Sequence, residues 1–199
     1  MMPRVAILIS GRGSNMVALA QAAQSGALAG CCEIAAVVSS RPSAPGLALA
    51  QELGLATFAL DARQLGPEAY DAALLAILDQ CRADVVVLAG YMRILSPRVV
   101  ARYRGRILNV HPADTAQHQG LHGYEWAFDQ RLPATQITVH LVDEGLDTGR
   151  VLAQREVDLR GADTLAEVER RGLAVEHQLY PEALKTFLAL SFPPLNPEP

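Results

Sequence analysis

The sequence predicts an α/β fold: an open, mostly parallel, twisted sheet with helices on both faces. Two observations support this prediction. Short runs rich in Val, Ile and Ala are apolar at every position, which is typical of parallel strands covered on both sides. Longer stretches rich in Ala and Leu separate these runs and carry apolar residues at helical spacing. Such alternation indicates right-handed crossover connections within one parallel sheet.

The expected elements follow from these patterns and from the turn and cap residues between them. In the first half, strands are expected at residues 5–9, 34–38 and 85–88, and helices at residues 16–27, 46–53 and 68–82. In the second half, strands are expected at residues 107–110, 137–142 and 151–157, with a short helix around Trp126 and Phe128. A final helix is expected from Asp163, its candidate N-cap, to Phe187. The proline-rich residues 191–199 cannot continue this helix, because proline lacks the N–H group.

The composition indicates one folded domain and leaves anionic small molecules possible as ligands, because a local site can be positive on a mildly acidic protein. The chain has 199 residues, 50% of them hydrophobic, which is enough for a sizeable core. Its 17 basic and 21 acidic residues give a net charge of −4, which argues against disorder and against a broad nucleic-acid surface. The chain has an odd number of cysteines, Cys31, Cys32 and Cys81, which favours reduced thiols over disulfides. No apolar run is long enough to span a membrane, so a cytoplasmic location is expected.

A glycine-rich segment, Ser10-Gly-Arg-Gly-Ser-Asn15, separates the first expected strand from the first expected helix. Glycine lets the backbone approach a ligand closely, and a helix N-terminus offers unpaired N–H groups, so the segment favours a bound phosphate. It matches neither the P-loop nor the full dinucleotide pattern, which argues against nucleoside triphosphates and NAD. The structural alternative is a tight turn in which Ser14 or Asn15 caps the helix.

Asn109 and His111 lie at the end of an expected strand. Alternate residues of a strand share a face, so their amide and imidazole are expected to lie together, where they can stabilise and protonate a developing oxyanion. A histidine at a strand end is also commonly structural. A carboxylate beside the ring would raise the pKa of His111 and hold the ring in place. The turn after a later strand offers Asp143, Glu144 and Asp147, and their spacing does not choose among them.

No metal site is predicted from the histidines. His118 and His122 stand four residues apart, which is ligand spacing on a helix, but Gly120 lies between them and no cysteine pair supports a site.

A series of segments resembles the folate-dependent formyltransferases, in particular those that act on glycinamide ribonucleotide in purine synthesis. Besides the glycine-rich segment, they are Leu88-Ala-Gly-Tyr-Met-Arg-Ile-Leu-Ser-Pro97, Leu108-Asn-Val-His-Pro112, Gly120-Leu-His122, Asp143-Glu-Gly-Leu-Asp-Thr-Gly149 and Glu176-His-Gln-Leu-Tyr-Pro181. The resemblance implies a formyltransferase-type fold with a Rossmann-like first half, in one domain over residues 1–199. Residues 1–100 would form the phosphate-binding half, residues 101–190 the catalytic and folate-binding half, and residues 191–199 a tail. It also implies transfer of a formyl group from 10-formyltetrahydrofolate, as co-substrate, to the ribonucleotide amine by a monomer or homodimer, without metal, nucleic acid or membrane.

The resemblance also implies roles for individual residues. The catalytic Asn, His and Asp of the family fall on Asn109, His111 and Asp147, which selects Asp147 among the three carboxylates. The ribonucleotide would bind Gly11, Gly13, Ser14 and Asn15 through its phosphate and Glu176 through its ribose. The folate would lie along Met92, Arg93, Ile94 and Leu95, with Asn109, Val142 and Asp143 completing its site.

Several positions depart from the family pattern. Residues 113–119 are polar where the family carries an apolar loop, which predicts a wetter and more mobile loop. Pro67 stands where a basic residue is common, and Arg63 is the candidate replacement. Gln136 and Ser40 replace a usual Gly and Asn. These changes put the substrate in doubt more than the class of reaction.

Three alternative functions stay open: a formyltransferase for another amine such as a sugar nucleotide, a formyltetrahydrofolate hydrolase, and a non-catalytic folate- or nucleotide-binding protein. The hydrolases usually carry an N-terminal regulatory domain, and the tRNA formyltransferases a C-terminal RNA-binding domain; neither is expected here. A binding protein has no need of the catalytic amide, imidazole and carboxylate together.

Overall fold

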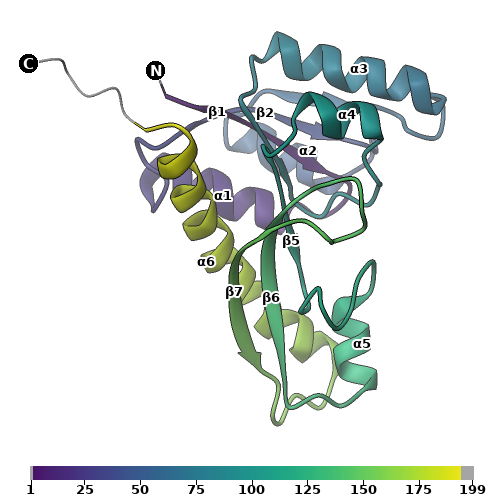
Figure 1. The fold of residues 1–199 in the computed structure, drawn as a ribbon, viewed down its shortest axis with the longest axis vertical. Helices are drawn as coiled ribbons and strands as arrows, with labels where there is room; N and C mark the ends of the chain where they lie inside the picture. Colours follow the sequence, from purple (N-terminus) through teal and green to yellow (C-terminus); the bar gives the residue numbers. More distant parts are fainter. Residues whose placement is uncertain (1, 194–199) are drawn as a thin grey trace, which may run out of the picture.

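The computed structural model describes residues 2–193, which form one seven-stranded sheet and the helices that cover it (Figure 1). The strands are β1 (Arg4–Ile9), β2 (Glu33–Ser39), β3 (Thr57–Ala59), β4 (Val85–Leu88), β5 (Ile107–His111), β6 (Ala134–Leu141) and β7 (Val151–Asp158). The helices are α1 (Ser14–Ser25), α2 (Pro45–Glu52), α3 (Pro67–Gln80), α4 (Pro97–Arg102), α5 (Gly123–Asp129) and α6 (Leu165–Ser191). None of the helices within residues 2–193 combines the length and the apolar character needed to cross a membrane.

The sheet confirms the predicted fold class. Its strand order is β3-β2-β1-β4-β5-β6-β7. The first five strands in this order pair in parallel, whereas β6 pairs antiparallel with β5 and β7 with β6. The apolar run at residues 5–9 of β1 and all of β4 lie at the centre of the sheet, where both of their faces are buried.

Helices cover the two faces of the sheet in two groups. On one face, Val5, Ile7 and Ile9 of β1 pack with residues of α1, α2, α5 and α6. On the other face, Ala6 and Leu8 pack with residues of α3 and α4. Figure 1 shows α6 running along one side of the sheet, with α3 and α4 on the other side. On this second face, Ile107 at the start of β5 packs with residues of α4, whereas His111 and Thr138 further along β5 and β6 bond to the loop that follows β5.

Several expected ends of elements were wrong. The N-cap of α6 is Thr164 and not Asp163, because the Thr164 side chain accepts a hydrogen bond from the Glu167 backbone N–H. The helix continues past Phe187 to Ser191. The tail residues 194–199 lie outside the described residues.

The remaining differences arise from strand pairing and from short elements. β6 begins at Ala134, three residues before the expected start, because its pairing with β7 extends to Ala134 opposite Asp158. The three-residue strand β3 and the six-residue helix α4 were not expected. The ends of α1, α2 and α3 differ from the expected ends by one or two residues.

Candidate active site

The Asp147 side chain lies at the centre of a buried polar cluster formed by β5, β6 and the β6–β7 loop. Its Oδ1 lies 3.5 Å from Asn109 Nδ2 and 3.4 Å from His140 Nε2. Its Oδ2 lies 3.6 Å from His111 Nδ1 and accepts a hydrogen bond of 2.8 Å from the Gly120 backbone N–H. The structure therefore brings together the amide, the imidazole and the carboxylate that the sequence singled out, and adds a second imidazole.

Strand register and a tight loop produce this arrangement. Asn109 pairs with His140 across β5 and β6, so the two side chains share a face. Asp147 has a φ of 52°, in the left-handed region that Asp tolerates better than most residues. Gly149 lets the loop return to the sheet, since a Cβ there would lie 1.8 Å from the Leu141 carbonyl oxygen.

The other two carboxylates of this loop have local roles. The Asp143 carboxylate accepts hydrogen bonds from Thr148 Oγ1 and from a backbone N–H of the loop, and it is exposed. Glu144 forms an exposed ion pair of 3.1 Å with Arg104. Of the three candidates, Asp147 is the one that faces the imidazole.

Burial and hydrogen bonding set the charge of the cluster. Burial lowers the pKa of His111, which is 3% exposed, and it outweighs the Asp147 carboxylate and the His118 carbonyl, which act in the opposite direction. The Asp147 carboxylate acts on this pKa in the expected direction, but burial makes the net shift downward. For Asp147, burial raises the pKa, but hydrogen bonds from His140 and Gly120 and the nearby imidazoles outweigh it, so the net pKa lies below 3.8. At neutral pH the carboxylate is ionised and the His111 ring is neutral.

The polar loop at residues 112–122 packs against the cluster. His111 Nε2 donates to the His118 carbonyl at 2.9 Å, and the two rings are 6.1 Å apart. The His118 ring also stacks on Trp126 at 4.9 Å. Thr138 of β6 donates a further hydrogen bond to a carbonyl of this loop. The loop thus covers one ring nitrogen of His111, while the other nitrogen faces Asp147.

The glycine-rich segment forms a close turn before α1. Gly13 has a φ of 81°, and a Cβ there would lie 2.9 Å from the Gly46 Cα. The Gly46 N–H donates to the Gly11 carbonyl at 3.0 Å. No side chain caps α1, and Ser14 and Asn15 lie inside the helix, so the alternative in which one of them is the cap is wrong. The first N–H groups of α1 are consequently available to an anion.

Glu176 lies on α6 within hydrogen-bond distance of Asn15, in the first turn of α1. Its carboxylate is 4% exposed and accepts hydrogen bonds from the Asn15 amide and the Tyr124 hydroxyl. Burial raises the pKa of Glu176, and these two hydrogen bonds oppose the increase.

The expected folate segment follows β4 and is partly exposed. Met92 and Ile94 are 55% and 85% exposed, whereas Leu95 is buried. The Arg93 guanidinium lies over the Tyr70 ring, 4.5 Å from its centroid. Leu95 belongs to the same apolar cluster as Val142, so the segment is connected to the start of the β6–β7 loop.

Hydrogen bonds connect the folate segment to the glycine-rich turn. Ser10 Oγ accepts a hydrogen bond of 2.9 Å from the Met92 N–H and lies 2.7 Å from Ser40 Oγ. Val142 and Asp143 line a cavity of about 400 Å³ between the β6–β7 loop and the turn after α4, and neither residues 92–95 nor Asn109 and Asp147 belong to its lining. The sequence-predicted site residues lie at or just after the ends of β1, β4, β5 and β6, except Glu176, which lies on α6.

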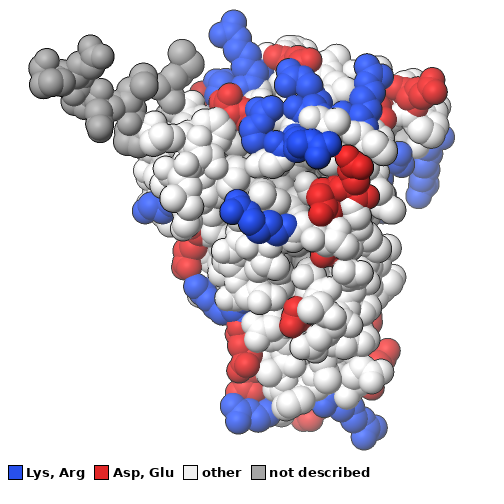
Figure 2. All heavy atoms as spheres, in the orientation of Figure 1, with Lys and Arg blue, Asp and Glu red and all other residues white. Residues whose placement is uncertain are grey.

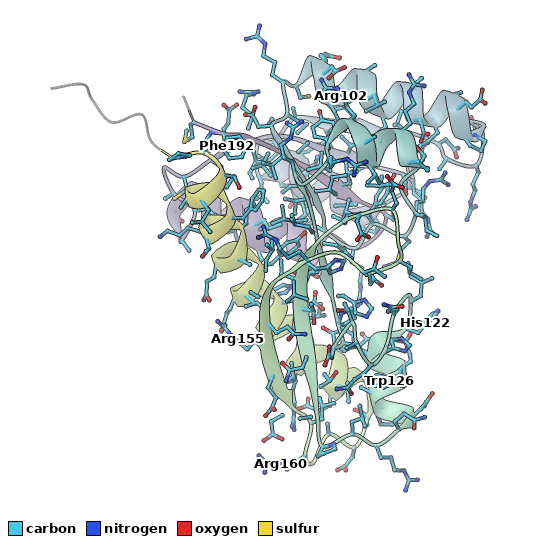
Figure 3. All side chains as sticks on the ribbon, in the orientation of Figure 1. Arg102, His122, Trp126, Arg155, Arg160 and Phe192 are labelled. Atoms are coloured by element: carbon cyan, nitrogen blue, oxygen red, sulfur yellow. The ribbon has the colours of Figure 1, made fainter. Side chains whose placement is uncertain are left out.

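Neither histidine of the expected loop is in a metal-ligand set. His118 Nε2 donates to the Leu121 carbonyl, and His122 pairs with Glu125 at the surface. Figure 3 shows His122 at the start of α5 and Trp126 on that helix. Residues 2–193 contain no group of three or more His, Cys, Asp or Glu side chains placed to hold a metal ion.

Sequence reasoning missed His140 and Tyr124 as members of these clusters. His140 was considered only among the histidines as a whole, and its role depends on pairing with Asn109, which a single sequence does not reveal. Tyr124 reaches Glu176 across 52 residues of chain, and no local pattern marks that contact.

The surface arginines of the α4 region are largely paired. Figure 2 shows basic side chains gathered over the upper part of this face, with acidic side chains among them. Arg102 pairs with Asp79 at 2.8 Å, and both Arg102 and Arg106 lie over the Tyr103 ring.

The family model for formyl transferase matches residues 3–184, and the chain therefore belongs to the formyl transferase family. A relative in Escherichia coli (strain K12), phosphoribosylglycinamide formyltransferase, is 38% identical over 184 residues, which cover 92% of this chain and 86% of the relative. The crystal structure of phosphoribosylglycinamide formyltransferase from Brucella melitensis is 44% identical, with a TM-score of 0.88 over 95% of this chain and 97% of that chain.

Part of a larger protein is also similar to this chain. The trifunctional purine biosynthetic protein adenosine-3 of Drosophila melanogaster is 36% identical over 182 residues, which cover 91% of this chain. The chain spans only 14% of the length of that relative.

Proposed function

We propose that this protein transfers the formyl group of 10-formyltetrahydrofolate to the amine of glycinamide ribonucleotide in de novo purine synthesis. The observation that carries the proposal is the buried cluster of Asn109, His111 and Asp147 at the ends of adjacent strands. Relatives named for this activity that cover most of the chain support the choice of substrate.

The two substrates would approach this cluster from opposite sides. The phosphate of the ribonucleotide would bind the turn at Gly11 and Gly13 and the first N–H groups of α1, at Ser14 and Asn15. Its ribose hydroxyls would donate to Glu176. The folate would lie along residues 92–95, with its pterin edge against the loop that carries Val142 and Asp143 and its formyl group near Asn109.

The reaction would proceed through a tetrahedral intermediate. The neutral amine attacks the formyl carbon, and the carbonyl oxygen becomes an oxyanion that accepts hydrogen bonds from Asn109 and His111. The proton lost by the amine passes to a water held by Asp147, or through that water to Nδ1 of His111, the ring nitrogen that faces Asp147, and it reaches N10 of the folate as the carbon–nitrogen bond breaks. A ligand oxygen reaches His111 Nε2 by replacing the His118 carbonyl there.

The proposal extends to the setting of the reaction. We propose a cytoplasmic protein, since its three cysteines are free thiols and two of them are buried. Its partners would be the two small-molecule substrates, and the monomer or homodimer state stays a prediction. One catalytic domain over residues 1–199 is likewise proposed.

A formyl-transfer assay tests the proposal. The protein is supplied with 10-formyltetrahydrofolate and, in separate reactions, glycinamide ribonucleotide, a sugar-nucleotide amine and water alone. Formylated glycinamide ribonucleotide is the expected product. Release of formate in water at the same rate would identify a hydrolase, and folate binding without any turnover would identify a binding protein.

A further inference from the structure

We propose that Tyr124 is a positioning residue that holds the Glu176 carboxylate for the ribose hydroxyls of the ribonucleotide. The inference rests on the proposed function, because it requires Glu176 to bind the ribose. Tyr124 lies on α5, directly after the loop that covers His111, and its hydroxyl donates to Glu176 Oε1. It would act through Glu176 and would not touch the reacting atoms.

The hydrogen bonds leave Glu176 able to bind a ligand. One carboxylate oxygen accepts from Tyr124 and the other from Asn15. Each carboxylate oxygen has two lone pairs, so each retains one acceptor site. The two protein donors fix the plane of the carboxylate, and fixing it before binding reduces the entropy lost on binding.

The Tyr124 ring packs against α6 at Gly172, where only a glycine leaves room for it. Gly172 lies one helical turn before Glu176 on α6, and a Cβ there would lie 2.1 Å from Tyr124 Cε1 and 2.4 Å from its hydroxyl oxygen. The ring therefore rests directly on the helix backbone, and a side chain at Gly172 would displace it. This contact aims the hydroxyl at Glu176.

The Asn15 side chain supports a hydroxyl ligand at this point. Its Nδ2 is committed to Glu176, and its Oδ1 is buried without a hydrogen-bond partner within the described residues. Leaving a buried acceptor without a hydrogen bond costs free energy. A ribose O–H group can donate to this oxygen, whereas an ionised phosphate oxygen has no proton to donate. The side chain thus suits the ribose, and the backbone N–H of Asn15 suits the phosphate.

The same contacts connect ribose binding to pH. The titratable groups that face Glu176 are Tyr124 from α5 and Tyr180 from α6, and α1 contributes the neutral Asn15. Glu169 of α6 acts on the Tyr124 hydroxyl. Burial raises the pKa of Glu176 and the Tyr124 hydrogen bond opposes this, so loss of that bond would raise the pKa further. A protonated carboxyl has fewer acceptor sites for the ribose.

The test is Tyr124→Phe, measured by steady-state kinetics over a range of pH and by calorimetric titration of the ribonucleotide alone. We expect KM and Kd for the ribonucleotide to rise about tenfold, as for loss of a hydrogen bond to a charged group. We expect the acid limb of kcat/KM for the ribonucleotide to move to higher pH, and kcat and the KM of the folate to stay unchanged. Tyr103→Phe is the matched control, since Tyr103 is a buried tyrosine at the end of α4, away from Glu176.

A second variant separates positioning from folding. Gly172→Ala keeps the hydroxyl but displaces the ring, so it should weaken ribonucleotide binding in the same way. The double variant Gly172→Ala/Tyr124→Phe should bind the ribonucleotide no more weakly than Tyr124→Phe alone. Unchanged ribonucleotide affinity and pH profile in Tyr124→Phe would overturn the inference. A fall in kcat and a rise in both KM values by similar factors, together with a lower Tm, would also overturn it, because that pattern indicates a structural role. If the unaltered protein binds the ribonucleotide but does not formylate it, the proposed function fails and the inference is decided by the titration.

Discussion

Asp147 is the residue that connects the two strands and the loop of the candidate site. Its two oxygens are approached by three side chains and one backbone N–H. Because His111 is buried and neutral, the ionised Asp147 is the main counterion available to an imidazolium that forms during the reaction. The carboxylate therefore has its largest effect when the proton is in transit.

Removal of either oxyanion donor should lower the rate without unfolding the protein. For Asn109→Ala and His111→Ala we expect kcat to fall roughly a hundredfold or more, because loss of one well-placed donor costs about 2.7–4 kcal/mol in the barrier. Single-turnover rates with saturating substrates measure the effect, and circular dichroism verifies the fold. Near-normal turnover in either variant would show that its side chain has no such role.

The pH profile should report the buried imidazole. His111 must be neutral to take a proton, and its pKa lies below the ordinary 6.5, so kcat/KM should fall only as the pH drops below that value. Asp147 raises the pKa of His111, so Asp147→Asn should move this acid limb to still lower pH as well as reducing the rate. A shift to higher pH would contradict the assignment. Asp143→Asn, at an exposed carboxylate of the same loop, is the control for a general charge effect.

At the scale of elements, predictability depended on whether a pattern is local. β1 and β4 could be predicted because central parallel strands are apolar on both faces. β3 was not predicted, because a strand of three residues is too short to show an alternating pattern. For α6, Asp163 and Thr164 are both good N-cap residues, and only the backbone geometry decides between them.

The N-cap of α6 is open to a direct test of that choice. Thr164→Ala should lower the free energy of unfolding by about 0.5–2 kcal/mol, because it removes the hydrogen bond from Thr164 Oγ1 to the Glu167 N–H. Denaturant titration measures the change. The adjacent Asp163→Ala is the control, and a larger loss there than at Thr164 would reverse the assignment.

The candidate site was less predictable than the elements that carry it. Asn109 and His111 could be placed together from strand alternation alone. Asp147 could not be chosen over Asp143 and Glu144 without the resemblance to a family, because the spacing of residues in a loop does not determine its backbone path. His140 required the register of an antiparallel pair, which is a non-local property.

At the scale of the whole molecule, one hydroxyl connects the long helix to the centre of the sheet. Tyr180 of α6 is fully buried, and its hydroxyl lies 3.0 Å from the Leu88 carbonyl and 2.9 Å from the Leu108 carbonyl. These carbonyls belong to β4 and β5, the strands that precede the folate segment and carry Asn109. The contact fixes α6, and with it Glu176, relative to the catalytic strands.

Loss of this hydroxyl should affect the stability of the whole domain. For Tyr180→Phe we expect a loss of about 1–3 kcal/mol in the free energy of unfolding, since the Leu88 and Leu108 carbonyls lose the one hydroxyl proton that they share. In a domain of this size that corresponds to roughly 2–4 °C in Tm per kcal/mol. Differential scanning calorimetry measures it, with Tyr103→Phe as the control. A Tm equal to that of the control would show that the hydroxyl contributes nothing.

The position of β7 has a consequence for how copies of the protein meet in a concentrated solution. β7 is the last strand of the sheet and pairs only with β6 within the described residues, so its outer row of backbone groups is a template for strand addition. Arg155, Glu156 and Asp158 place charges of both signs along that strand. Desolvating these charges would oppose edge-to-edge pairing, which protects the sheet from growing into an aggregate.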